Sequence, residues 1–213
     1  TEPVIIKPRH GSGTSEATPV LVASDWHCEE IVGPEVGDLN RFNPDIFSQR
    51  SERFFTAGLR LLQMVNRDVS IHTVVLALLG DFITNQIHGA ENAEKNAMPP
   101  TDAIVNAQNH IIGGIDFFLN HSKYSLVILC KVGNHARTTQ RTRFSTENGH
   151  SLEYLLYRYL AAHFRGEKRV RFVIEEGYHT YLPVYEKVIR FHHCHALQYQ
   201  GGVGGLFIPA YKA

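Results

Sequence analysis

Polar side chains of the kinds that bind metal ions or move protons follow four apolar runs of this sequence. One example is LVILCKVGNHARTT, residues 126–139, which reads as a buried strand that ends at Gly133. The polar groups after the four runs are Asp25-Trp26-His27, Gly80-Asp81, Gly133-Asn134-His135 and His192-His193-Cys194-His195. In open α/β sheets, ligands bind at the carboxyl ends of the strands. We therefore expect these side chains to form one site.

Carboxylate and imidazole groups in one site predict metal binding. Together they suit a first-row divalent ion such as Mn, Fe, Co, Ni or Zn. The sequence contains no Ser-His-Asp elbow, Walker loop or Gly-rich dinucleotide fingerprint, so a metal-assisted reaction is the simplest interpretation. Two ions ~3.5–4 Å apart need a bridging carboxylate, and Asp81 is the candidate, because a strand-Gly-Asp turn can place it centrally. Asn134 would add a neutral ligand, and His135 could protonate a leaving group.

The elements that must position these residues alternate along the chain. Apolar runs predict strands, and apolar residues at helical spacing predict helices between them. The expected strands are 20–24, 73–79 and 125–132, and the expected helices are 46–65, 104–119 and 152–160. This alternation predicts a mainly parallel sheet with helical crossovers.

Three further strand-like runs follow at 169–174, 180–185 and 187–191. Their spacing is too short for crossovers, so we expect them to be antiparallel. The fold class is then a mixed α/β domain over residues 19–213. Residues 7–18 are rich in Gly, Ser, Thr and charge, so we expect residues 1–18 to form a flexible arm.

Composition argues against several classes of protein. The chain has 213 residues, of which 43% are apolar and 20% charged, as in ordinary globular domains. No apolar run approaches the ~20 residues that cross a bilayer, so we expect no membrane contact. The 21 basic and 21 acidic residues cancel, so net charge gives no sign of nucleic-acid binding. Three cysteines without CxxC spacing argue against a disulfide framework and favour a reducing, cytoplasmic location.

Asp-X-His, Gly-Asp and Gly-Asn-His, in this order after strands, resemble the calcineurin-like metallophosphoesterase superfamily over about residues 20–205. Within it, the chain is most similar to phage- and prophage-encoded phosphoesterases related to DNA-repair exonucleases. The local similarity lies in GDFITNQIH (80–88), GNHARTT (133–139) and HHCHALQYQGGVGG (192–205). The resemblance implies a four-layer fold, in which helices flank a sandwich of two mixed β-sheets.

The resemblance also implies hydrolysis of phosphomonoesters or phosphodiesters by a metal-bound hydroxide at a dinuclear centre. We expect two divalent ions, Mn first and Fe, Zn, Ni or Co as alternatives, and a phosphodiester substrate, with DNA as a candidate. Carried over by position, one ion is held by Asp25, His27 and Asp81, and the second by Asp81 and Asn134. His135 is then the acid or the transition-state stabiliser.

The HHCH cluster allows two assignments. In the family, Gly-Asn-His is followed by a lone histidine ligand and later by Gly-His-X-His. In the assignment that we favour, His193 is the lone ligand and Gly-His-X-His lies beyond Ala213, so that the domain is truncated at its C-terminus. In the other, His193 and His195 form the last pair and His179 is the lone ligand. Both His193 and His195 are kept as candidate metal ligands.

Other interpretations stay open. Arg137 could clamp a phosphate through its fork of donors, although a solvated loop arginine fits equally well. A chain without Gly-His-X-His could be a catalytically incomplete or degenerate module that acts as a binding or scaffold domain. A third interpretation is a domain with one structural zinc, which would unfold on chelation.

Overall fold

The computed structural model describes residues 3–9, 15–34, 40–87, 89, 94–142 and 144–197. Within them the strands are β1 (Glu16–Ala17), β2 (Val20–Ala23), β3 (Ser70–Ile71), β4 (Thr73–Leu78), β5 (Ser125–Cys130), β6 (Val170–Ile174), β7 (Thr180–Val184) and β8 (Lys187–Phe191). The α-helices are α1 (Pro44–Val65), α3 (Pro100–His121) and α4 (Leu152–His163), and the short 3-10 helices are η2 (Phe144–Thr146) and η3 (Asn148–His150). The protein is therefore of the α/β class.

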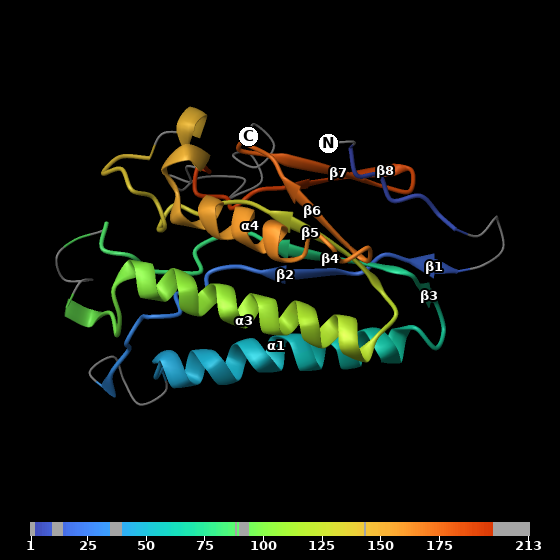
Figure 1. Ribbon diagram of the computed structural model, residues 1–213, viewed down its shortest axis with the longest axis horizontal. Helices are drawn as coiled ribbons and strands as arrows, with labels where there is room; N and C mark the ends of the chain where they lie inside the picture. Colours follow the sequence, from blue (N-terminus) through green and yellow to red (C-terminus); the bar gives the residue numbers. More distant parts are fainter. Residues whose placement is uncertain are drawn as a thin grey trace, which may run out of the picture.

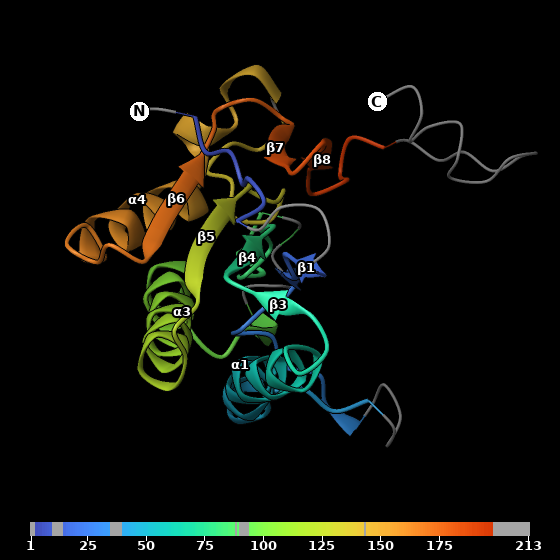
Figure 2. The same ribbon diagram turned by 90° about the vertical axis from the view of Figure 1, so that its right-hand side faces the viewer.

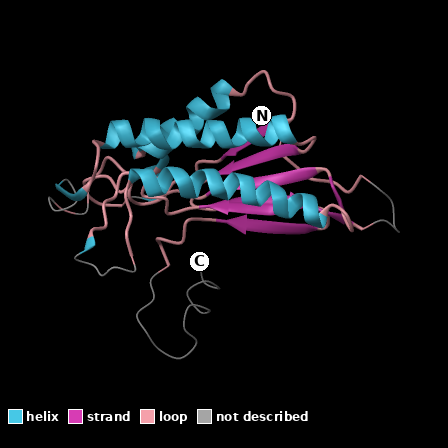
Figure 3. Ribbon diagram, turned by 90° about the horizontal axis from the view of Figure 1, so that it is seen from below, coloured by secondary structure: helices cyan, strands magenta, loops and turns pink. Residues whose placement is uncertain are grey.

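Four parallel strands form the central sheet, in the order β2-β4-β5-β6. Each consecutive pair is joined through a helix, α1, α3 or α4, so that the strands all point the same way (Figures 1 and 3). A parallel pair needs such a crossover, because a tight turn would reverse the chain direction. The carboxyl ends of the four strands consequently lie at one edge of the sheet.

The helices begin where the sequence supplies partners for their first backbone groups. Asn43 caps α1, since its Oδ1 accepts the Ile46 N–H at 2.8 Å, and Ser151 caps α4 by accepting the Glu153 N–H at 3.2 Å. Both α1 and α3 have a proline at their start, where the missing N–H is not needed. Among the described residues, no helix combines the length and the apolar character that a bilayer span requires.

The two middle strands of the central sheet, β4 and β5, are buried on both faces. On β4, Val74, Leu76 and Leu78 pack in the core shared with the helices, whereas Val75 and Ala77 pack in the core beneath the β7–β8 hairpin. This alternation follows from the two-residue period of a strand. Figure 2 shows the helices on one side of the sheet and β7 and β8 on the other.

The sequence predicts three antiparallel strands near the end of the described chain, and this is wrong for the first of them. β6 pairs in parallel with β5, with Leu126 opposite Val170. The reason is that α4 already makes the crossover from β5 to β6. β7 and β8 pair antiparallel, as predicted, with Thr180 opposite Phe191.

Parts of the segment expected to be a flexible arm pair with other segments. The Ile6 N–H donates to Pro183 O at 3.0 Å, and β1 pairs with β3. Residues 1–2 and 10–14 of this segment lie outside the described residues. So do His88, at the end of GDFITNQIH, and residues 198–213, which include the GGVGG part of the last motif.

Candidate metal centre

The loops after β2 and β4 stay paired beyond the ends of their strands. The Asp25 N–H donates to Gly80 O at 2.9 Å, and the His27 N–H donates to Asp81 O at 3.1 Å. These bonds continue the parallel ladder of the sheet into the loops. They hold Asp25 and His27 beside Asp81, although the two segments are far apart in the sequence.

Two glycines allow the loops after β4 and β5 to touch. Gly80 has a φ of 89°, and a Cβ there would overlap the backbone of Gly133. A Cβ on Gly133 would in turn overlap Oδ1 and the backbone N of Asp81. In the structure, Asp81 Oδ1 instead accepts the His135 N–H at 2.8 Å. Only glycine at both positions leaves Asp81 this close to the second loop.

Three candidate ligands have backbones in the left-handed region. The φ angles are 56° at Asp25, 43° at His27 and 53° at Asp81. This conformation costs roughly 1–2 kcal/mol for a residue with a Cβ, and such strain gathers at functional sites. Three strained residues in two adjacent loops therefore mark this edge of the sheet as the candidate site.

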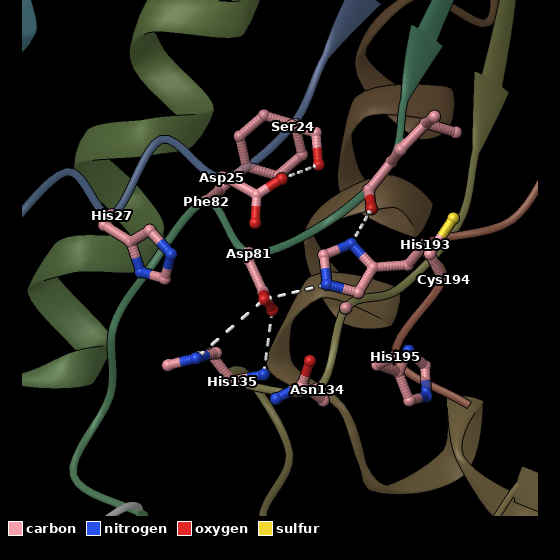
Figure 4. Close-up of polar contacts among 12 residues, drawn as sticks. Ser24, Asp25, His27, Asp81, Phe82, Asn134, His135, His193, Cys194 and His195 are labelled. Atoms are coloured by element: carbon pink, nitrogen blue, oxygen red, sulfur yellow. Dashed lines mark hydrogen bonds and ion pairs between the residues drawn. The ribbon is translucent and has the colours of Figure 1, made fainter. Parts of the chain in front are cut away.

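Asp81 belongs to two groups of potential metal ligands. In the first, ligand atoms of His27, Asp81 and His135 all lie within 4.8 Å of one another. In the second, the same holds for Asp25, Asp81 and His193. Figure 4 shows Asp81 among these side chains, which follow β2, β4, β5 and β8. Each group could hold a metal ion, and the Asp81 carboxylate is common to both groups.

Asp81 and His193 form a buried ion pair. His193 Nε2 lies 2.8 Å from Asp81 Oδ2, and His193 Nδ1 donates to Leu79 O at 2.6 Å. Burial alone would raise the pKa of Asp81, but the hydrogen bond and the charge of His193 hold this pKa below its usual value. Burial would lower the pKa of His193, but Asp81 outweighs this effect and raises the pKa to about 9. The cationic imidazole of His193 thus neutralises the central carboxylate.

The Asp81–His193 pair predicts that the metal-free protein loses stability in alkaline solution. A pKa raised from 6.5 to about 9 stabilises the fold fully below pH 6.5, and this contribution is lost as the pH rises through about 9. Between pH 6.5 and about 10 we expect the free energy of unfolding to fall by roughly 2–3 kcal/mol. Urea denaturation in the presence of EDTA would measure the fall, and His193→Gln should remove it. An equal decline in wild type and variant would contradict the prediction.

Thr84 fixes the orientation of two histidines. His135 Nδ1 donates to Thr84 O at 3.0 Å, and His27 Nδ1 lies 3.1 Å from Thr84 Oγ1. The two rings meet edge to face, with their centroids 4.7 Å apart. Burial lowers the pKa of His27 and the nearby His135 lowers it further, which favours the neutral imidazole that binds metal. Metal-binding histidines commonly have their second ring nitrogen held in this way.

Asn134 and Arg137 both belong to the loop after β5. Asn134 is half-buried and lies beside His135 in Figure 4. Arg137 is buried, not solvated, and its guanidinium donates to the backbone carbonyls of Asn134, of Thr139 at 3.1 Å and of Gln140 at 3.5 Å. These bonds brace the loop and engage Nε, Nη1 and Nη2, so at most two of the five guanidinium N–H groups would be left for a phosphate. The clamp stays a prediction.

The histidines of HHCH divide between two places. His193 is in the second ligand group, whereas His195 Nε2 lies 2.7 Å from Glu147 Oε1. The ring of His179 packs against that of His192, with their centroids 5.0 Å apart. Neither His195 nor His179 is in a ligand group found among the described residues. Both assignments of the HHCH histidines stay predictions.

Reasoning from the sequence missed two buried carboxylates at this edge. Glu29 Oε1 accepts the N–H groups of Thr84 and Asn85, both at 2.8 Å. Glu153 is fully buried, and this burial, together with the charge of Asp81, raises its pKa to about 8. No sequence pattern marks these two glutamates, because their partners are backbone groups of loops that only the fold brings near.

No family model matches the chain, and no curated protein or solved structure matches it either. At the carboxyl edge of a parallel sheet, two aspartates and three histidines form two ligand groups around the buried Asp81.

Proposed function

We propose that this protein is a metal-dependent phosphoester hydrolase. The observation that carries the proposal is the position of Asp81, which belongs to both ligand groups. Hydrolases with two metal ions clamp the attacking and leaving oxygens between them, and a shared carboxylate holds such a pair. The donor set fits, because carboxylate and imidazole together bind Mn, Fe, Co, Ni or Zn. The resemblance to calcineurin-like metallophosphoesterases supports the same function.

Most residues of the centre would bind the metal ions, and one would transfer a proton. Asp81 would hold both ions, and the remaining ligands would be Asp25, His27, His193 and the amide of Asn134. Bound ions would supply a nucleophile at neutral pH and neutralise charge on phosphoryl oxygens. The resemblance makes His135 the acid, so that its Nε2 would donate a proton to the leaving group instead of binding an ion, while Nδ1 is held by Thr84 O.

We extend the proposal to phosphodiesters as substrates, with DNA among them, and to Mn as the ion. Both extensions rest on the resemblance, since 21 basic and 21 acidic residues give DNA no electrostatic support. The resemblance also supports a four-layer sandwich, in which β7 and β8 would belong to the second sheet. Three cysteines without a disulfide fit the proposed cytoplasmic location.

Metal stoichiometry tests the proposal first. The chain would be stripped with EDTA, loaded with Mn²⁺, freed of unbound ion and analysed for Mn per chain. We expect two ions, together with hydrolysis of bis(p-nitrophenyl) phosphate that EDTA stops and Mn²⁺ restores. Asp68→Asn changes an exposed carboxylate in the turn after α1 and should behave like wild type. Absence of bound Mn, or two ions without hydrolysis of this ester or its monoester, would contradict the proposal.

One observation favours a second candidate, a binding or scaffold module without catalysis. His195, one of the candidate ligands, pairs with Glu147 and joins neither ligand group found among the described residues. A structural zinc site would need four protein ligands, one more than either group has. One loosely held ion without hydrolysis is the result expected for a binding module. Unfolding on chelation would instead indicate a structural ion.

A further inference from the structure

A buried glutamate joins the two loops that carry Asp81 and Asn134. Glu153 lies in the first turn of α4 and has no exposed surface. Its Oε1 accepts the Phe82 N–H at 2.7 Å, and its Oε2 accepts the Gly133 N–H at 2.8 Å. Phe82 directly follows Asp81, and Gly133 directly precedes Asn134. One carboxylate therefore holds both loops next to candidate ligands.

The start of α4 is itself fixed to the segment after β5. The Leu152 N–H donates to Ala136 O at 2.9 Å, and Tyr157 Oη donates to Lys131 O at 2.8 Å. Glu153 stands between these two contacts along the helix. The carboxylate is therefore attached to a helix end that cannot move without breaking them.

The usual role of an acidic residue in the first turn of a helix does not explain why Glu153 is buried. Acidic residues are common in the first turn of a helix, because they interact favourably with its dipole, but that interaction works at the surface. Burying a carboxylate is costly unless hydrogen bonds replace those it made to water. Glu153 meets this requirement with backbone groups of two loops outside its own helix. The burial of Glu153 is therefore explained by the hydrogen bonds that its carboxyl group accepts from both loops.

We propose that Glu153 is a positioning residue of the metal centre, which fixes Asp81 relative to Asn134 and His135 and thereby raises the affinity for metal. The inference rests on the proposed function in one respect, namely that the centre binds metal. Groups that orient metal ligands typically contribute about 10- to 100-fold to affinity. Glu153 acts on two ligand-bearing loops at once, so the effect should be clearly measurable.

Glu153→Gln tests the inference. Glutamine keeps the shape of the side chain, but its NH₂ group would face one of the two backbone donors. Calorimetric titration of the metal-free chain with Mn²⁺ should give an affinity about 10- to 100-fold below that of wild type. Glu153→Asp keeps the carboxyl group but is shorter by one methylene, so we expect an intermediate loss.

Ile115→Ala is the matched control. Ile115 is fully buried and packs with Leu21, Val74 and Leu126, near the amino ends of the strands and away from the candidate ligands. Its truncation leaves a cavity, so the midpoint of unfolding should fall. The affinity for Mn²⁺ should nevertheless equal that of wild type.

The outcomes separate this inference from the proposed function. A folded Glu153→Gln chain that binds Mn²⁺ as tightly as wild type overturns the inference. An equal loss of affinity in Ile115→Ala overturns it too, because the effect would then follow stability alone. If Glu153→Gln does not fold, Glu153→Asp decides by the same criteria. A wild-type chain that binds no Mn²⁺ overturns the proposed function itself, and the inference with it.

Discussion

Asp81→Asn is expected to remove both metal ions and to slow phosphodiester hydrolysis by roughly a thousandfold, because several kcal/mol of transition-state stabilisation would be lost. Asparagine keeps the shape of the side chain and an oxygen that can accept the His135 N–H. It lacks the charge that both ligand groups share. Equilibrium dialysis with Mn²⁺ and an assay at saturating ester would measure the two effects.

Asp25→Asn provides the comparison. Asp25 is exposed and belongs to one ligand group only, so we expect this variant to keep one ion. His193 loses its ion-pair partner in Asp81→Asn but not in Asp25→Asn. The alkaline loss of stability should therefore vanish in the first variant and persist in the second. If the two variants lost metal equally, Asp81 would not have the shared role.

Gly133→Ala should damage the fold and the metal centre together. The added Cβ would overlap Oδ1 and the backbone N of Asp81, and backbone atoms cannot move aside as the end of a flexible side chain can. Overpacking typically costs about 1–3 kcal/mol, and we expect the upper end of this range. For a chain of this size, the thermal midpoint should then fall by roughly 6–12 °C in differential scanning calorimetry.

Gly113→Ala is the control for this substitution. Gly113 lies on α3, and a Cβ there would meet no atom within 4 Å. Alanine in place of glycine inside a helix stabilises by about 0.5–1 kcal/mol, so this variant should melt slightly above wild type and bind Mn²⁺ normally. A Gly133→Ala chain that melted like Gly113→Ala would show that the two loops do not need their close contact.

The central sheet and its ligand edge could be predicted because local patterns determine them. Continuous apolar runs are typical of parallel strands that are buried on both faces, and β4 and β5 are such strands. Parallel strands end at one edge, so Asp81 could be placed beside Asp25 and beside His135 from their positions after these runs. The direction of β6 could not be predicted in this way. The short connection from β6 to β7 does not determine how β6 pairs with β5. The parallel pairing of β6 with β5 follows from the helix that precedes β6.

Contacts made through the backbone could not be predicted. Glu29, Glu153 and Thr84 hold the ligand loops through N–H and C=O groups, which nearly every residue has. The partners of these three residues therefore cannot be recognised from the residue types in the sequence. His193 and His195 show the same difficulty, because they are close in sequence but contact different acidic residues, Asp81 and Glu147.

The crossover topology has a consequence for how the centre forms. Each parallel pair joins segments far apart in the sequence, as Val20 with Val75 and Leu126 with Val170. Pairings of this kind form slowly, because chain entropy is lost before the contacts compensate it. The candidate ligands therefore meet only once most of the sheet is in place, and a partly folded chain offers them no common position. An ion would stabilise the finished protein without guiding its folding.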